Sequence, residues 1–256
     1  MATRGLTPSA SAAPPELDGA APWFAPWWTW LEPALAGWRR QGSVSAALNG
    51  LVSQAPVVFV PQADLPAGQA YEDFIYAHHR VPTRDNLHDF FNGCCWHRFP
   101  QSKLRLNQLQ GEEIQRMGVQ ATRGPVRDAL TLFDENVALL QAPDALWQAL
   151  QQRDWHGLFV TLRPLWREVR WELFGHALLE KLVQPYKAIT AHVYRVAPEV
   201  APGDRALDAW LASTLSPDHL ATKPYQPLPV LGVPGWSVDN EASAYYADRT
   251  VFRPRR

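Results

Sequence analysis

Polar side chains of the kinds that bind metal ions gather in one segment, from Arg80 to Asn107, among aromatic and apolar neighbours. On a helix, His88 and Asn92 lie one turn apart and share a face, and Asp89 follows His88 directly. Imidazole and carboxylate groups are the usual protein ligands of zinc, iron and manganese. The segment therefore contains a candidate metal site. Its candidate ligands are His78, His79, Asp85, His88, Asp89 and Asn92.

The same residues also have a purely structural interpretation. Asp85 would cap the helix, His88 and Asp89 would be hydrogen-bonded, and Asn92 would satisfy a buried carbonyl group. The segment shows no defined spacing of metal ligands that separates the two interpretations, so both stay open.

A second group of polar residues recurs at every fourth position further along the chain. On one helix these residues form a single stripe, from which two or three side chains could chelate a cation. The alternative is a solvated polar face whose charge is balanced by neighbouring arginines. Gly175 is unfavourable inside a helix, which favours the close approach of another backbone or of a ligand at this point. The group consists of Glu168, Glu172, His176 and Glu180.

A third group of charged residues lies between positions 123 and 136. An arginine next to carboxylates could bind an anionic substrate or shift the pKa of an acid. The alternative, which the pattern favours, is an internal network of ion pairs and caps that locks the helix to its neighbours. The group consists of Arg123, Arg127, Asp128, Asp134 and Glu135.

Together the three groups predict one polar pocket, formed where residues 84–92 meet helices at 123–136 and 172–181. We expect this pocket to bind a ligand or to have a structural or interaction role. The alternative is a hydrolase that depends on a divalent metal, with His88, Asp89 and His176 as catalytic candidates. The candidate metal ligands are His88, Asp89, Glu172, His176 and Glu180, and the candidate ligand-binding residues are Arg84, Asp85, Asn92, Arg127 and Asp134.

The order of histidines and asparagine also invites comparison with nucleases of the histidine-asparagine-histidine type. That motif needs a strand-strand-helix frame, whereas His78 and His79 are expected to end a helix. The 24 basic residues nearly cancel the 25 acidic ones, so the chain lacks the positive field that usually attracts nucleic acid. A nucleic-acid partner is therefore not expected, and no other partner is indicated.

Other signatures of enzymes and of targeting are absent from the sequence. The chain has no phosphate-binding glycine loop, dinucleotide fingerprint, HExxH, GxSxG or paired CxxC motif. Cys94 and Cys95 are adjacent, which disfavours a disulfide and fits a reducing compartment. One of them could be a nucleophile near His97, but beside Phe91 and Trp96 both are expected to be small core residues. No secretory signal or apolar run long enough to span a membrane occurs. We therefore expect a cytoplasmic bacterial protein.

The spacing of apolar residues and the positions of glycine and proline predict a mainly α fold with a few short strands. Residues 57–61 form a β-branched run that indicates a strand, and Gly124 with Pro125 starts a helix whose buried stripe extends from Val126 to Leu140. Asp85 is expected to cap the helix that follows it, and Pro100 to end that helix. The other expected helices run from Trp27 towards Arg39 and over residues 72–79, 144–152, 164–183 and 204–215, the last being the final helix of the chain.

The two ends of the chain differ in composition from its centre. Residues 1–21 are rich in Ala, Pro and Ser, and we expect a disordered tail. Residues 22–256 are expected to form a single globular domain of helices. Within it, the proline-rich residues 216–256 are expected to form an extended C-terminal arm that packs across the helical body.

Four blocks of this sequence occur in the same order in a known family. They are VPTRDNLHDFFN at 81–92, RGPVRDALTLFDEN at 123–136, FGHALLEKL at 174–182, and PLPVLGVPGW followed by the terminal VFRPRR. The chain resembles the bacterial family called domain of unknown function 3025, over roughly residues 23–256. The resemblance implies that these blocks belong together, and it implies no activity.

Overall fold

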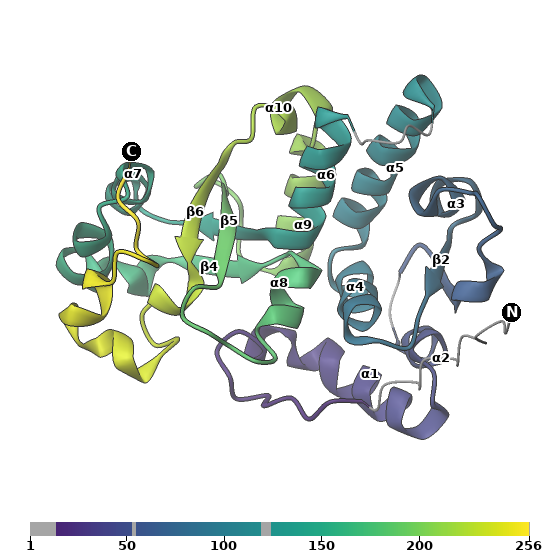
Figure 1. Ribbon diagram of the computed structural model, residues 1–256, viewed down its shortest axis with the longest axis horizontal. Coiled ribbons are helices and arrows are strands. Elements are labelled where there is room, and N and C mark those ends of the chain that lie inside the picture. The colour runs from purple at the N-terminus through teal and green to yellow at the C-terminus, as the bar shows by residue number, and fades with distance from the viewer. Residues whose placement is uncertain (1–13, 53–54, 119–123, 256) are drawn as a thin grey trace, which may run out of the picture.

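The structure is a computed structural model that describes residues 14–52, 55–118 and 124–255. The described chain is mainly helical and contains two small β-sheets (Figure 1). No helix in these ranges is long and apolar enough to cross a bilayer. The α-helices are α1 Trp28–Gln41, α2 Val44–Asn49, α3 Tyr71–His78, α4 Leu87–Arg98, α5 Pro100–Met117, α6 Pro125–Asn136, α7 Asp144–Gln152, α8 His176–Lys181, α9 Asp204–Thr214 and α10 Pro217–Ala221.

The strands form one parallel pair and one mixed sheet of four strands. The pair consists of β1 and β2, and the larger sheet has the order β4-β3-β5-β6. In the larger sheet β3 and β5 run parallel, whereas β4 and β6 pair antiparallel at the two edges. The strands are β1 Val58–Pro61, β2 Arg80–Thr83, β3 Val137–Gln141, β4 Arg170–Leu173, β5 Thr190–Arg195 and β6 Tyr225–Pro229.

Two apolar clusters lie in different parts of the molecule. The larger cluster contains fully buried aromatic side chains such as Trp27, Trp38 and Phe91, and it joins the α-helices to one another and to the sheet. The smaller cluster joins α7 to the C-terminal segment and includes Phe159 and Phe252. In Figure 1 the larger sheet stands between α7 with the yellow C-terminal segment on one side and most of the α-helices on the other.

The helices α4 and α5, which follow β2, begin at a capping residue and at a proline respectively. The Asn86 side chain accepts a hydrogen bond from the backbone N–H of Asp89 and so caps α4. The expected cap, Asp85, was therefore the wrong residue, because its carboxylate instead accepts the first N–H of α2 at Val44, over 2.7 Å. The expected break at Pro100 is confirmed, since α4 ends at Arg98 and Pro100 opens α5.

Two expected helices extend over residues that form strands of the sheet, although the expected helix start at Pro125 is confirmed. The stripe expected from Val126 to Leu140 divides after Asn136, where β3 begins between β4 and β5 and buries Val137 and Leu140. The helix expected over 164–183 is instead a 3-10 helix η4 Arg163–Glu168, the strand β4 and the short helix α8.

The ends of the chain differ in several details from expectation. Residues 1–13 of the expected disordered tail lie outside the described residues, while Ala21 is buried and Arg39 donates a hydrogen bond to the Pro15 carbonyl. The helix at 204–215 is not the last, because α10 follows it. The C-terminal segment contains strand β6 at the sheet edge, where prolines are tolerated. It also contains the 3-10 helices η5 Val230–Gly232, η6 Val238–Glu241 and η7 Ser243–Ala247.

Candidate metal centre

Three elements bring side chains together that lie far apart in the sequence. His88 lies in the first turn of α4, Glu135 near the end of α6, and His176 at the start of α8. The short helix α8 contacts both α4 and α6. Gly175, just before α8, allows this approach, because a Cβ atom there would lie only 2.3 Å from the Glu135 carbonyl oxygen. The expected close approach of a backbone at Gly175 is thus confirmed, although the residue caps a helix rather than interrupting one.

The potential ligand atoms of His88, Glu135 and His176 all lie within 4.8 Å of one another. The two histidine Nε2 atoms are 3.1 Å apart, and the rings meet edge to face at 77°. Two imidazole nitrogens bound to one cation at about 2.0–2.1 Å are separated by roughly 2.9–3.4 Å, depending on the coordination angle. The separation of the two rings therefore suits a shared cation. Without an ion, one neutral ring can donate its Nε2–H to the other.

The second ring nitrogen of His88 is held by a carboxylate. Its Nδ1 lies 2.9 Å from Oε2 of Glu180, which is four residues after His176 on α8. This hydrogen bond is the main cause that raises the pKa of His88, against the opposing effect of burial. A ring that donates Nδ1–H to a carboxylate presents Nε2 to a metal, which is a common arrangement around metal-binding histidines.

His176 is buried and its environment keeps it neutral. Burial lowers the pKa of His176 to about 3, because a charged ring would lose its hydration. Its Nδ1 lies 3.6 Å from Oδ2 of Asp134, so a carboxylate is also close to the second nitrogen of this ring. The neutral imidazole is the form that binds a metal.

Asp134 forms an ion pair with the buried side chain of Lys103 and also lies close to His176. Lys103 donates hydrogen bonds to Asp134 Oδ1 over 2.5 Å and to Asn92 Oδ1 over 2.8 Å. Although burial works to raise the pKa of Asp134, the charges of Lys103 and His176 and the lysine hydrogen bond hold it below its usual value. Asn92 in turn donates to the hydroxyl of Tyr71. This network of hydrogen bonds holds Asp134 and Asn92 in place beside the histidines.

Two of the predicted metal ligands are engaged elsewhere. Asp89 accepts three hydrogen bonds from Arg84, one from its backbone N–H and two from its guanidinium. Glu172 accepts from the buried guanidinium of Arg98, which also pairs with Asp204. The structure thus groups His88 and His176 with Glu135. Glu180 binds the other ring nitrogen of His88, and Asp89 and Glu172 do not belong to the group.

A cavity of about 500 Å³ opens onto His88, Glu135 and His176, and we call it the histidine cavity. Four of the five predicted ligand-binding residues line it, namely Arg84, Asn92, Arg127 and Asp134. The fifth, Asp85, is bonded to the start of α2 instead. Other polar lining groups had no sequence motif that would single them out; they include Gln62, Tyr71, Gln110 and Thr131.

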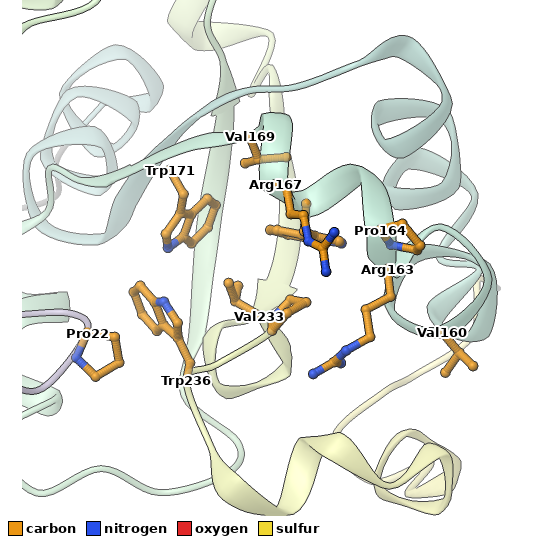
Figure 2. A pocket seen from close by; sticks show the side chains of 11 residues that line it. Pro22, Val160, Arg163, Pro164, Arg167, Val169, Trp171, Val233 and Trp236 are labelled. Atoms are coloured by element: carbon orange, nitrogen blue, oxygen red, sulfur yellow. The ribbon is translucent and has the colours of Figure 1, made fainter.

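A second cavity, of about 630 Å³, lies between η4, β4 and the C-terminal segment, and we call it the tryptophan cavity. Figure 2 shows Trp171 and Trp236 on one side of it and Arg163 and Arg167 on the other. Arg163 is held in place by Asn240, Tyr246 and Glu241. Among the described residues no histidine, cysteine or carboxylate lines this cavity, and these are the side chains that most often hold metals or act as nucleophiles.

The cysteines do not supply a nucleophile either. Cys94 and Cys95 are both fully buried, which confirms the expectation of core residues. Burial raises the pKa of Cys95 to about 12, and its thiol donates to the carbonyl of Phe174. A thiol in this environment stays protonated and is not reactive.

Comparison with known proteins bears on the family. A family model with the description "Protein of unknown function (DUF3025)" matches residues 57–256, which contain both histidines and Glu135. The match includes all four sequence blocks and begins later than the resemblance expected from residue 23. Comparisons with curated proteins and with solved structures gave no match.

Proposed function

The chain belongs to the family DUF3025, whose description assigns no activity, and we propose from the geometry of its site that it is a metal-dependent hydrolase. The observation that carries the proposal is the convergence of His88, Glu135 and His176 on one side of an open cavity. Two histidines and one glutamate form a known ligand set of catalytic zinc sites, and the set also suits iron and manganese.

The two histidines have the support that such a site requires, and the glutamate is free to bind. Glu180 orients His88, and burial keeps His176 neutral. Among the described residues the Glu135 side chain has no hydrogen-bond or ion-pair partner, so its carboxylate remains available to a cation. A divalent cation with an open coordination position lowers the pKa of water and polarises a carbonyl or phosphoryl oxygen, which is the chemistry of hydrolysis.

A structural role accounts for the surrounding polar residues but not for the grouping of His88, Glu135 and His176. Asp89 with Arg84, and Asp134 with Lys103, satisfy one another and fix the packing of α4, α5 and α6. A buried network of this kind needs no open space. The histidine cavity, in contrast, leaves a carboxylate and two imidazoles facing a volume large enough for a small molecule. The open volume favours the hydrolase over the purely structural account.

The first experiment measures how much metal the wild type and matched variants retain. Purified protein is loaded separately with Zn²⁺, Mn²⁺ and Fe²⁺, desalted, and analysed for bound metal. The wild type is expected to retain one equivalent of at least one metal, and Glu135→Gln and His176→Ala to lose it. Glu172→Gln is the control, because it removes a carboxylate that pairs with Arg98 away from the cavity. Retention of the same metal by Glu135→Gln would contradict the proposed ligand set.

The second experiment asks whether the loaded protein hydrolyses bonds. Chromogenic carboxylic esters, phosphomonoesters and phosphodiesters are offered to the metal-free and metal-loaded forms. We expect turnover only in the loaded form, with loss of turnover on chelation and in Glu135→Gln. Loaded protein that is inactive on all three classes of bond, while binding metal with full stoichiometry, would favour a structural or ligand-binding metal site over a hydrolase.

A further inference from the structure

Arg127 lines the histidine cavity from α6, two helical turns before the proposed metal ligand Glu135. Arg127, Thr131 and Glu135 are spaced four residues apart, so they follow one face of the helix, and all three line the cavity. Eight residues of α-helix correspond to about 12 Å along the axis between Arg127 and Glu135. The backbone positions of Arg127 and Glu135 therefore lie about two helical turns apart along the wall of the cavity.

Among the described residues this guanidinium has no ion-pair partner. Within the described residues Arg127 forms no ion pair or hydrogen bond, and its Nε atom is buried without a partner. The other arginine of the cavity, Arg84, is held by Asp89 through Nε and Nη2, and Lys103 is held by Asp134 and Asn92. A buried charged donor without an acceptor is unfavourable, and an anion from solution would supply that acceptor.

A neighbouring hydroxyl points to the same kind of ligand. Thr131 accepts a hydrogen bond from Gln110 at its Oγ1 over 3.3 Å, which leaves its own O–H free to donate. Arg127 and Thr131 together thus offer several donors on one helix face. Guanidinium groups bind carboxylates and phosphates through paired parallel hydrogen bonds, so an oxyanion matches this set of donors.

We propose that Arg127 and Thr131 form an anion subsite that holds a carboxylate or phosphate group of the substrate. This inference rests on the proposed function for the same cavity, where the bond to be cleaved would lie beside His88, Glu135 and His176. The substrate is then a small molecule with its anionic group about two helical turns from the reacting bond. A volume of about 500 Å³ accommodates such a molecule.

The anion subsite is tested on metal-free protein, so that its outcome does not depend on the metal. Binding of inorganic phosphate and of succinate is measured by calorimetry for the wild type, Arg127→Gln, Arg127→Lys and Thr131→Val. We expect the wild type to bind at least one of the two anions. Arg127→Gln should weaken that binding at least tenfold, Arg127→Lys should weaken it less, and Thr131→Val should weaken it measurably. The two anions distinguish a phosphate from a carboxylate substrate.

Two controls separate the anion subsite from other causes. Arg167→Gln removes an exposed arginine that lines the tryptophan cavity and should leave anion affinity unchanged. Glu135→Gln should abolish metal retention but keep anion binding, whereas Arg127→Gln should do the reverse. Melting curves establish that each variant is folded. Absence of anion binding in the wild type, or equal binding in folded Arg127→Gln, overturns the subsite, and the metal analysis still decides the proposed function separately.

Discussion

Glu180 shows how one carboxylate controls the metal-binding form of a histidine. It accepts the hydrogen bond of His88 Nδ1 over 2.9 Å, so it fixes both the ring orientation and the nitrogen that faces the cavity. Replacing such a partner around a metal ligand typically costs about 10- to 100-fold in metal affinity. Glu180 therefore supports the site although it is not one of the three converging ligands.

We predict that Glu180→Gln lowers the metal affinity of the protein by about 10- to 100-fold while the metal stoichiometry stays at one. Glutamine keeps the size of the side chain and an acceptor oxygen, but it removes the charge that favours His88 Nδ1–H. Affinity is measured by competition with a chromogenic chelator. An affinity within threefold of the wild type would show that Glu180 does not orient His88 for binding.

His97 gives the protein a pH dependence that is separate from the metal site. The ring lies against Trp30 and Phe59, and burial lowers the pKa of His97 from 6.5 to about 4. Between these two values the unfolded chain binds a proton that the folded chain does not. The contribution to stability is therefore complete above pH 6.5 and is lost as the pH falls towards 4. The fully developed loss is on the order of 3 kcal/mol.

We predict that His97→Gln reduces the dependence of the unfolding free energy on pH between 6 and 4.5. In this interval His97 and His176 each take up close to one proton when the wild type unfolds, because burial lowers the pKa of both rings. The variant should take up about one proton fewer than the wild type. Urea unfolding at several pH values provides the slopes. Equal slopes in the two proteins would mean that His97 titrates normally in the folded state.

The residue types of the site could be predicted from the sequence, but the grouping of ligands could not. His88 and His176 stand out because imidazole is a common ligand and both occur in polar surroundings. The sequence places Glu135 in a helix-locking network with Asp134, whereas in the structure Asp134 binds Lys103 and Glu135 does not take part in that network. Asp134 and Glu135 are adjacent on α6 and both line the histidine cavity, but only the packing of α8 shows that Glu135 is the carboxylate left without a lysine and grouped with the two histidines.

At the scale of elements, the junction between β4 and α8 determines where His176 lies. β4 pairs antiparallel with β3, and Phe174 and Gly175 donate their backbone N–H groups to the Val137 carbonyl. The chain then turns into α8 at a point where no side chain fits beside the Glu135 backbone. The position of His176 relative to Glu135 thus depends on a glycine.

We predict that Gly175→Ala destabilises the protein by about 1–3 kcal/mol and weakens metal binding, because the added methyl group must displace the Glu135 backbone. Gly124→Ala is the matched control. Its Cβ would meet nothing within 4 Å, so the change should alter stability by less than about 1 kcal/mol and leave metal affinity unchanged. Urea unfolding and chelator competition measure the two effects. Comparable behaviour of the two alanine variants would contradict the close approach seen at Gly175.

The misassigned helix at 164–183 shows why local periodicity was insufficient. Glu168, Glu172 and His176 repeat every four residues, which is the helical period, yet they lie in η4, β4 and α8 respectively. The strand forms because β3 offers a paired edge and because Leu173 is buried against it. Strand formation here depends on a partner strand that lies about thirty residues earlier, and no window of local sequence contains that information.

For the molecule as a whole, composition and periodicity were sufficient to predict a mainly helical chain. They were insufficient for the four-stranded sheet, because β3 continues the apolar stripe of α6 and β6 lies in a proline-rich segment. The sheet organises the site nonetheless. It holds the end of α6 next to the start of α8, and it thereby sets the positions of Glu135 and His176 relative to each other.

The wide separation of the three proposed ligands in the sequence leads to a prediction for the stability of the whole protein. His88, Glu135 and His176 approach one another only in the folded chain, so a metal that they bind together stabilises the folded state by mass action. At a free metal concentration 100 times the dissociation constant, the stabilisation is about 2.7 kcal/mol. For a chain of this size each kcal/mol corresponds to about 2–4 °C, so the melting temperature should rise by roughly 5–11 °C.

This rise should depend on the metal ligands and not on charge in general. Glu135→Gln is expected to melt at the same temperature with and without metal, whereas Glu172→Gln should keep the full rise, because its carboxylate binds Arg98 outside the cavity. Differential scanning calorimetry with a metal titration and a chelator reversal measures the effect. A rise of equal size in Glu135→Gln would place the bound metal elsewhere in the molecule. No rise in the wild type at saturating metal would show that the three side chains meet without forming a metal site.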